Sequence, residues 1–171
     1  MYTLKKSLGQ HFLRDENICC KIVDALQEQP FDRLLEVGPG GGALTKYLLE
    51  LPGIDFRAVE LDEEKVQFLE TTYPALKGRL IHRSFLDIDC PFEQDFTLVG
   101  NFPYNISTQI LFKVLEWEHQ VERVIGMFQK EVAQRVAAPP GSKVYGVISV
   151  LVQAWYEVQY QVLPVALYQV T

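Results

Sequence analysis

The sequence has few cysteines and no long apolar run. Its three cysteines, Cys19, Cys20 and Cys90, lack metal-ligand spacing, and an odd number does not fit a disulfide framework. No apolar run reaches the length of about 18 residues that a membrane-spanning helix needs. The first residues also lack the apolar core of a signal peptide. We therefore predict a cytoplasmic protein with no bound metal and no membrane partner.

The sequence also has fewer basic than acidic residues. The net charge is -6 at pH 7, whereas nucleic-acid-binding domains usually carry a basic face. A net charge is only a sum, so a local basic surface is still compatible with this composition. The basic residues that could form one are Lys5, Lys6 and Arg14 near the N-terminus and Arg123, Lys130, Arg135 and Lys143 in the second half.

The pattern of apolar residues predicts strands alternating with helices. Strands are predicted at 33–38, 55–61, 78–84, 96–101, 121–129 and 157–163. Helices are predicted at 17–27, 43–51, 62–73, 107–117, 130–137 and 145–156, with Ser107 as an N-cap. This alternation indicates an α/β fold with a mostly parallel sheet and helices on both faces. Ligands bind such sheets beyond the carboxyl ends of the strands.

A glycine-rich loop, "EVGPGGGALT", follows the first predicted strand and leads into a helix. Glycines such as Gly38 allow a tight turn and let a ligand approach the backbone closely. Glu60 lies at the end region of the second predicted strand, 22 residues after Gly38, where an acid can accept hydrogen bonds from the hydroxyls of a ribose. The combination predicts a cofactor that contains adenosine but does not by itself say which one.

Two residues in the loop favour S-adenosyl-L-methionine over a dinucleotide. A pyrophosphate needs free N–H groups at the start of the helix, and Pro39 lacks one. Glu36 adds negative charge, which is unfavourable beside a diphosphate but acceptable beside a sulfonium cation. Asp87 follows the third predicted strand, where its carboxylate could accept a hydrogen bond from the amino group of adenine. An NAD-dependent dehydrogenase is therefore a weak alternative.

The segment "NFPY" follows the fourth predicted strand. The exocyclic amine of adenine is a poor nucleophile, and two acceptors on its N–H groups would draw the nitrogen toward a nucleophilic geometry. The side-chain oxygen of Asn101 and the carbonyl of Phe102 can be these acceptors, and Pro103 stiffens the turn. Tyr104 offers a flat face to a base taken out of its stack. We therefore predict these four residues as the catalytic group.

These motifs together resemble the rRNA adenine N6-methyltransferase superfamily. The resemblance runs from "GQHFL" near the N-terminus through "EVGPGGGALT", "VELD", "SFLD" and "GNFPYNIST", and the later "QKEVAQR" and "SKVYGVISV" favour its small-subunit branch. It implies a Rossmann-like class I S-adenosylmethionine-dependent methyltransferase fold. It also implies dimethylation of two adjacent adenosines near the 3′ end of 16S rRNA, during ribosome biogenesis, with the small ribosomal subunit as partner.

The resemblance also assigns roles to individual residues. It implies that His11 and Leu13 contact the methionine end of the cofactor and that Gly38 lies beneath it. Glu60 would hold the ribose and Asp87 the adenine. Asn101 would serve both the cofactor and the target amine, and Tyr104 would stack on the target base.

The end of the sequence departs from the family. Members continue with a Pro-x-Pro-Lys segment and a small helical C-terminal domain, and Leu167 stands where they have a phenylalanine beside the target base. We therefore predict one catalytic domain over 1–171, with 1–16 as an arm of the cofactor site and the helical domain absent. We also expect the sheet to have an open edge where a strand is lost, with "VALYQV" near the end of the sequence as a segment that could partly fill that place.

Two other functions are compatible with the same motifs. A 23S rRNA adenine methyltransferase of the large subunit shares the loop and the Asn-x-Pro-Tyr motif. A non-catalytic RNA-binding or ribosome assembly factor could use the same fold. The RNA substrate and methyl transfer itself distinguish these alternatives.

Overall fold

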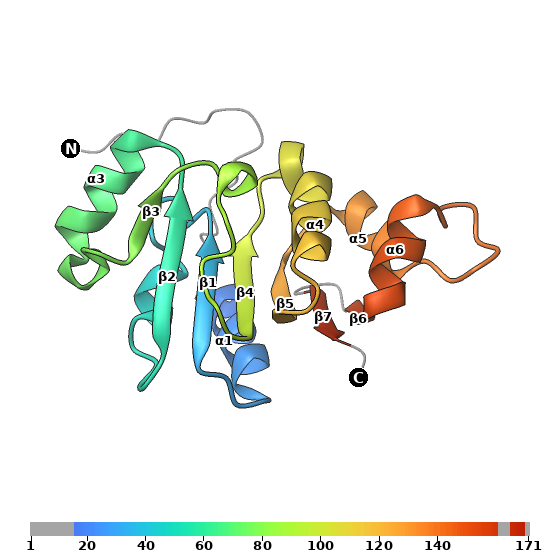
Figure 1. Cartoon of the computed structure of the whole chain (residues 1–171), viewed down its shortest axis with the longest axis horizontal. Helices are drawn as coiled ribbons and strands as arrows, with labels where there is room; N and C mark the ends of the chain where they lie inside the picture. The colour runs from blue at the N-terminus through green and yellow to red at the C-terminus, as the bar shows by residue number, and fades with distance from the viewer. Residues whose placement is uncertain (1–15, 161–164, 170–171) are drawn as a thin grey trace.

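A computed structural model of the protein describes residues 16–160 and the backbone of residues 165–169. Figure 1 shows a central sheet with helices packed around it. The strands are β1 (Arg33–Val37), β2 (Asp55–Glu60), β3 (Leu80–His82), β4 (Phe96–Asn101), β5 (Val121–Met127), β6 (Tyr156–Tyr160) and β7 (Val165–Gln169). The helices are α1 (Glu16–Gln27), α2 (Thr45–Leu48), α3 (Glu63–Thr72), α4 (Ser107–Glu116), α5 (Lys130–Ala137) and α6 (Val147–Trp155). Short 3-10 turns lie at η1 (Pro74–Leu76), η2 (Phe85–Asp87) and η3 (Tyr104–Ile106).

The sheet has seven strands in the order β3-β2-β1-β4-β5-β7-β6. The first five strands in this order are parallel, and β7 is antiparallel to both β5 and β6. The chain moves outward from β1 to β3 in one direction and then from β4 to β5 in the other. The strand order therefore reverses between β1 and β4, and the carboxyl ends of these two strands are the expected place for a ligand.

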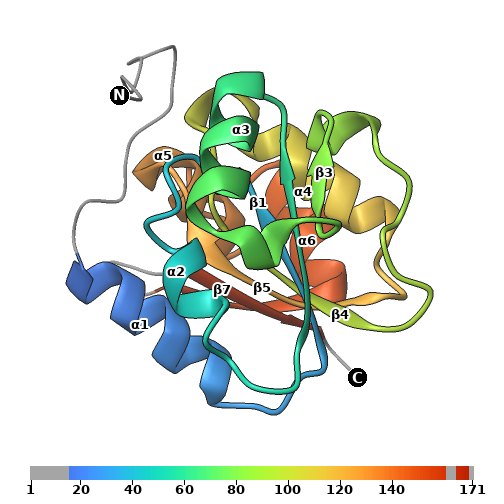
Figure 2. The same cartoon turned by 90° about the vertical axis from the view of Figure 1, so that its left-hand side faces the viewer.

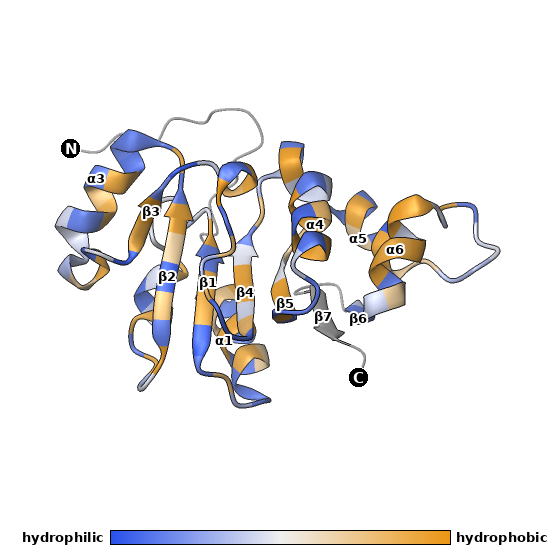
Figure 3. Cartoon of the chain, in the orientation of Figure 1, coloured by the Kyte–Doolittle hydropathy of each residue, from blue (hydrophilic) through white to orange (hydrophobic). Residues whose placement is uncertain are grey.

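Each face of the sheet is covered by its own helices, as the view turned by 90° shows (Figure 2). Side chains alternate between the faces along each strand: Leu34 belongs to one core cluster and Leu35 to the other. The helices α1, α2 and α3 pack on the Leu34 face, and α4, α5 and α6 pack on the Leu35 face. The strands are correspondingly rich in apolar residues (Figure 3), as expected for a sheet buried on both faces.

The predicted fold class is confirmed, and three local predictions are wrong. Ser107 is the first residue of α4 and Ile106 takes the N-cap position, while the Ser107 hydroxyl donates to the Tyr104 carbonyl at 3.2 Å. The helix predicted at 43–51 is the shorter α2, since residues 43–44 and 49–50 form turns on either side of it. The edge expected to be open is occupied, since β7 pairs with β5 and β6.

Within 16–160 and 165–169, no helix is long and apolar enough to cross a membrane. The same residues contain no group of three or more His, Cys, Asp or Glu side chains placed to hold a metal ion.

A candidate cofactor and base site at the strand ends

A cavity of about 260 Å³ lies at the carboxyl ends of the first four strands. Its wall is formed by the glycine loop after β1, the end of β2 with the first turn of α3, the turn after β3, and the segment after β4. The wall thus includes the ends of β1 and β4, between which the strand order reverses. The location agrees with the general rule for ligands on parallel sheets.

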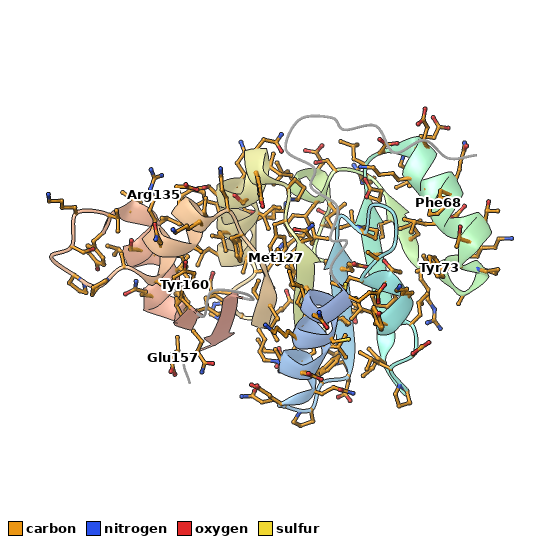
Figure 4. All side chains as sticks on the ribbon, turned by 180° about the vertical axis from the view of Figure 1, so that it is seen from behind. Phe68, Tyr73, Met127, Arg135, Glu157 and Tyr160 are labelled. Carbon is orange, nitrogen blue, oxygen red and sulfur yellow. The ribbon has the colours of Figure 1, made fainter. Side chains whose placement is uncertain are left out.

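The glycine loop forms one side of the cavity. Gly38, Gly40 and Gly42 have φ values of 69°, 57° and 84°, a region that residues with a side chain rarely adopt. A Cβ on Gly42 would also lie 2.7 Å from the ring of Tyr73, the residue after α3 that is labelled in Figure 4. The glycines are therefore required both for the path of the loop and for its contact with α3.

Glu60 ties the glycine loop to the end of β2. Its side chain is 5% exposed and lines the cavity. One carboxylate oxygen accepts the Gly40 N–H at 3.0 Å, and the other accepts the Asp62 N–H at 3.1 Å. The amide of Gly40 is therefore already bonded, and α2 has only four residues. Both features disfavour a pyrophosphate site of the dinucleotide type.

Glu36 is a second buried carboxylate on the cavity wall. It is 2% exposed and accepts a hydrogen bond of 2.5 Å from the Thr45 hydroxyl. Burial raises the pKa of Glu36 to about 8, with a further increase from the charge of Glu60, while the bond from Thr45 acts in the opposite direction. Burial thus favours the neutral form of the Glu36 carboxyl, and a cation bound in the cavity would stabilise its charged form.

The segment after β4 forms the opposite side. Asn101 ends the strand, and Asn101, Phe102 and Pro103 all line the cavity. The Phe102 side chain is 1% exposed, and its ring centroid lies 4.7 Å from that of Phe128. The Phe102 N–H donates to the carbonyl of Met127 at 3.1 Å, and Met127, the last residue of β5, is labelled in Figure 4. The backbone that carries the predicted acceptor carbonyl is therefore fixed by packing and by β5.

Tyr104 and Asp87 do not line the cavity. Tyr104 begins the turn η3 and is partly exposed. Asp87 ends the turn η2, with an exposed side chain, and its N–H donates to the Ser84 carbonyl at 3.0 Å. After β3 the wall is instead formed by Arg83, Ser84, Phe85 and Leu86.

The structure therefore brings together Gly38, Glu60 and the segment 101–103 from the predicted site. His11 and Leu13 lie outside the described residues. Lys65, on α3, lines the cavity although sequence reasoning did not select it. Its position on the helix that begins at Glu63, shortly after Glu60, was the available signal, but a lysine at such a position usually lies on the solvent side.

The basic residues of the second half do not all face solvent. Arg123 is 3% exposed and is part of the interior, so it cannot contribute to a basic surface. Lys130, Arg135 and Lys143 are exposed, and Arg135 lies on α5 (Figure 4). The N-terminal basic residues predicted with them lie outside the described residues.

The arrangement suits one kind of ligand. Two buried carboxylates face a cavity with apolar residues on its wall, such as Leu61 and Phe85. Asn101 and the turn after it lie at the same cavity. The site can hold a cationic nucleoside and offer polar acceptors to a second, neutral group beside it.

Comparisons with known proteins agree with this geometry. The family model for ribosomal RNA adenine dimethylase matches residues 1–165. A Ribosomal RNA small subunit methyltransferase A of Parabacteroides distasonis is 52% identical over 158 residues, which cover 91% of this chain and 59% of the relative. A protein of the same name from Flavobacterium johnsoniae is 50% identical, over 91% of this chain and 60% of the relative. The chain thus spans about three fifths of the length of these relatives.

Solved structures show the same fold. A dimethyladenosine transferase from Plasmodium falciparum has a TM-score of 0.78 at 23% identity and covers 94% of this chain and 64% of its own. The 23S rRNA methyltransferase ErmE has a TM-score of 0.79 at 22% identity, over 94% of this chain and 70% of its own. The fold is that of a Rossmann-like class I methyltransferase, as predicted. Because the family model matches nearly the whole sequence, the chain belongs to the ribosomal RNA adenine dimethylase family.

Proposed function

We propose that this chain is a catalytic domain that transfers methyl groups from S-adenosyl-L-methionine to the exocyclic amines of adenosines in 16S rRNA. The observation that carries the proposal is a single cavity that joins the glycine loop and Glu60 to Asn101, Phe102 and Pro103. A cofactor site and a base site must meet in this way for a methyl group to pass directly between them.

The residues on the wall fit the cofactor. The buried carboxylates of Glu36 and Glu60 match a ligand that carries a sulfonium and an ammonium group. In this proposal Glu60 accepts hydrogen bonds from the ribose, and the bare backbone at Gly38 allows close approach. His11 and Leu13 complete the methionine end in this proposal. When bound, the cofactor supplies an electrophilic methyl group.

The segment after β4 would prepare the target amine. Asn101 and the Phe102 carbonyl accept its two N–H groups, so that the nitrogen lone pair is turned toward the methyl group. Pro103 and the packing of the Phe102 ring keep this turn rigid. Tyr104 would stack on the flipped base from the rim of the cavity, and Asp87 remains a candidate contact to the cofactor at the rim. Catalysis then rests on alignment of the two reactants and needs no charged general base.

The proposed substrate is the small ribosomal subunit, with dimethylation of two adjacent adenosines near the 3′ end of its rRNA. The names of the curated relatives support the small subunit, as do the motifs in the second half of the sequence. Ribosomes are assembled in the cytoplasm of bacteria, which is the location we propose. Exposed basic residues such as Lys130 and Arg135 are candidates to contact the RNA.

Methyl transfer from tritiated S-adenosyl-L-methionine to small subunits that lack dimethyladenosine tests the proposal. The unaltered chain should label adenosine, and Asn101→Ala should reduce the rate by about 100-fold or more, the usual contribution of a positioned catalytic group. Gln109→Ala, which changes an exposed residue on α4, is the matched control. Cofactor binding by calorimetry is measured on all three proteins.

The other candidates predict different results. Labelling of 23S rRNA but not of small subunits would indicate the large-subunit activity. Binding of rRNA with no transfer by the unaltered chain, and no effect of Asn101→Ala, would indicate a non-catalytic assembly factor. Absence of any binding of S-adenosyl-L-methionine would contradict the proposal itself.

A further inference from the structure

The turn η3, which follows the predicted catalytic segment, also reaches the cavity. Of its three residues, Asn105 and Ile106 line the cavity and Tyr104 does not. Successive residues of a 3-10 turn point about 120° apart, so one turn can hold one side chain at the rim and its neighbours in the cavity. Asn105 is therefore the polar residue that η3 presents to the site.

The side-chain amide of Asn105 is available to a ligand. The residue is exposed, although it lines the cavity. No hydrogen bond joins its side chain to another of the residues that the structure describes. An amide of this kind offers two N–H donors and one oxygen acceptor, and a base that enters the cavity can bind them without breaking an existing contact.

The segment after β4 has few polar groups from which to build a base site. Between residues 101 and 106 the cavity is lined by Asn101, Phe102, Pro103, Asn105 and Ile106. Only Asn101 and Asn105 among these have polar side chains. In the proposed function the oxygen of Asn101 and the carbonyl of Phe102 accept the two N–H groups of the target amine. On this side of the cavity, Asn105 is then the side chain left to bind another atom of the base.

The target adenine has such an atom next to its amine. Enzymes read a base taken out of its stack at its Watson–Crick edge. In adenine this edge carries the 6-amino donor and, beside it, the ring nitrogen N1, which is an acceptor. An acceptor that is enclosed without a donor weakens binding, so a site that encloses this edge needs an N–H group opposite N1.

We propose that the side-chain amide of Asn105 donates a hydrogen bond to N1 of the target adenine. The inference rests on the proposed function, because it assumes a target base beside Asn101. With the amine held by two acceptors and N1 by a donor, the base cannot turn in its own plane, and its amine stays aligned with the methyl group. Guanine carries a hydrogen on N1, so its N–H would oppose the amide N–H, and the same contact selects against guanine.

Single-turnover methyl transfer to small subunits that lack dimethyladenosine, at saturating cofactor, tests the inference. Asn105→Asp replaces the amide nitrogen with an oxygen, which at neutral pH is only an acceptor. Its rate should lie about tenfold or more below that of the unaltered chain at pH 8. Protonation turns the new carboxyl into a donor. The rate relative to the unaltered chain should therefore rise as the pH falls to 6, by up to about tenfold per pH unit.

Two further variants separate the lost donor from the added charge. Asn105→Ala removes the donor without adding charge, so its rate should be low and its ratio to the unaltered chain should not depend on pH. Gln109→Glu makes the same change from amide to acid at an exposed position of α4 and is the matched control. It should transfer methyl groups like the unaltered chain at each pH.

Cofactor affinity and folding are measured on the same proteins. Calorimetry with S-adenosylhomocysteine should give Kd values within about twofold of each other, because Asn105 contacts the target base and not the cofactor. Thermal unfolding of each variant separates a local loss of activity from a failure to fold.

Three results would overturn the inference and leave the proposed function intact. They are a rate ratio for Asn105→Asp that does not change with pH, the same pH dependence in Gln109→Glu, and a tenfold loss of S-adenosylhomocysteine affinity in Asn105→Ala. The last result would place Asn105 at the cofactor. Absence of methyl transfer by the unaltered chain to either ribosomal subunit would overturn the proposed function and the inference with it.

Discussion

The ring of Phe102 occupies the space that a side chain at Gly126 would need. Gly126 of β5 is paired in register with Gly100 of β4. A Cβ at Gly126 would overlap the Phe102 ring, and one at Gly100 would lie 3.1 Å from that ring and 2.7 Å from the Val37 carbonyl oxygen. Two neighbouring glycines in the centre of the sheet thus leave room for the ring against the strands, and the ring fixes the turn that follows Asn101.

Gly126→Ala should therefore disturb the turn after β4. The added methyl group forces the ring or the strand to move, which should lower the free energy of unfolding by about 1–3 kcal/mol, the usual cost of overpacking a core. Methyl transfer should fall further than cofactor affinity, because the acceptor carbonyl belongs to Phe102. Denaturant unfolding and single-turnover transfer measure both. Gly146→Ala, where nothing lies within 4 Å of the new Cβ, should leave methyl transfer unchanged and should cost only the loss of a favourable N-cap residue of α6, about 0.5 kcal/mol.

The raised pKa of Glu36 predicts that stability decreases as the pH rises. The pKa is about 8 in the folded protein, because burial opposes the charge, and close to its ordinary value of 4.5 in the unfolded chain. Between these pH values the folded state holds a proton that the unfolded state releases. The free energy of unfolding should therefore fall from pH 5 to pH 8, by up to about 1.4 kcal/mol per pH unit from this group.

Glu36→Gln isolates this contribution, because it removes the titration and keeps an oxygen that can accept the Thr45 hydroxyl. Denaturant unfolding of both proteins at several pH values gives the difference between their stabilities. The variant should gain on the unaltered chain as the pH rises from 5 to 8, while the other titrating groups affect both proteins alike. Parallel curves would show that Glu36 is already charged at pH 5.

Glu60→Gln should weaken S-adenosylhomocysteine binding by about tenfold or more, because a buried polar mismatch costs about 1–3 kcal/mol. An amide offers one oxygen, whereas Glu60 accepts N–H groups with both oxygens, from Gly40 and from Asp62. The amide nitrogen would face an N–H group and displace the loop. Calorimetry gives the affinity, and Glu63→Gln on the exposed start of α3 is the control. Equal affinities for the two variants would exclude a role for Glu60 in the site.

The order of the elements could be predicted from sequence because the strands are short apolar runs ended by glycine or polar residues. "RLLEVG" and "FTLVGN" fall within one residue of β1 and β4. Ser107 was wrongly predicted as an N-cap. A serine at the start of a helix can either accept a hydrogen bond from a backbone N–H group or donate one to a preceding carbonyl, and the path of the preceding turn decides between the two. The segment "VALYQV" was considered for the open edge but not predicted as a strand, because the place of β7 between β5 and β6 depends on tertiary pairing.

The site was predictable where residues end a strand or follow it directly. Gly38, Glu60 and Asn101 all occupy such positions, and all three line the cavity. Asp87 and Tyr104 lie at the far end or the start of short 3-10 turns, where the direction of a side chain depends on the turn and not on the strand. Lys65 was missed for a related reason, since its burial depends on how α3 packs against the sheet.

Arg123 illustrates how a charged residue can be structural, and it gives the last prediction. Its guanidinium donates to the carbonyls of Leu26 and Gln29 at 3.1 Å and 3.3 Å, at the negative end of the α1 dipole. Arg123→Met leaves these carbonyls without their charged donor and should lower the free energy of unfolding by about 2–4 kcal/mol. Denaturant unfolding measures the loss, with Arg79→Met, an exposed arginine, as the control. An equal and small loss of unfolding free energy in both variants would show that Arg123 does not hold α1 against β5. A large loss confined to Arg123→Met, with the cofactor affinity of the folded protein unchanged, would show that it does.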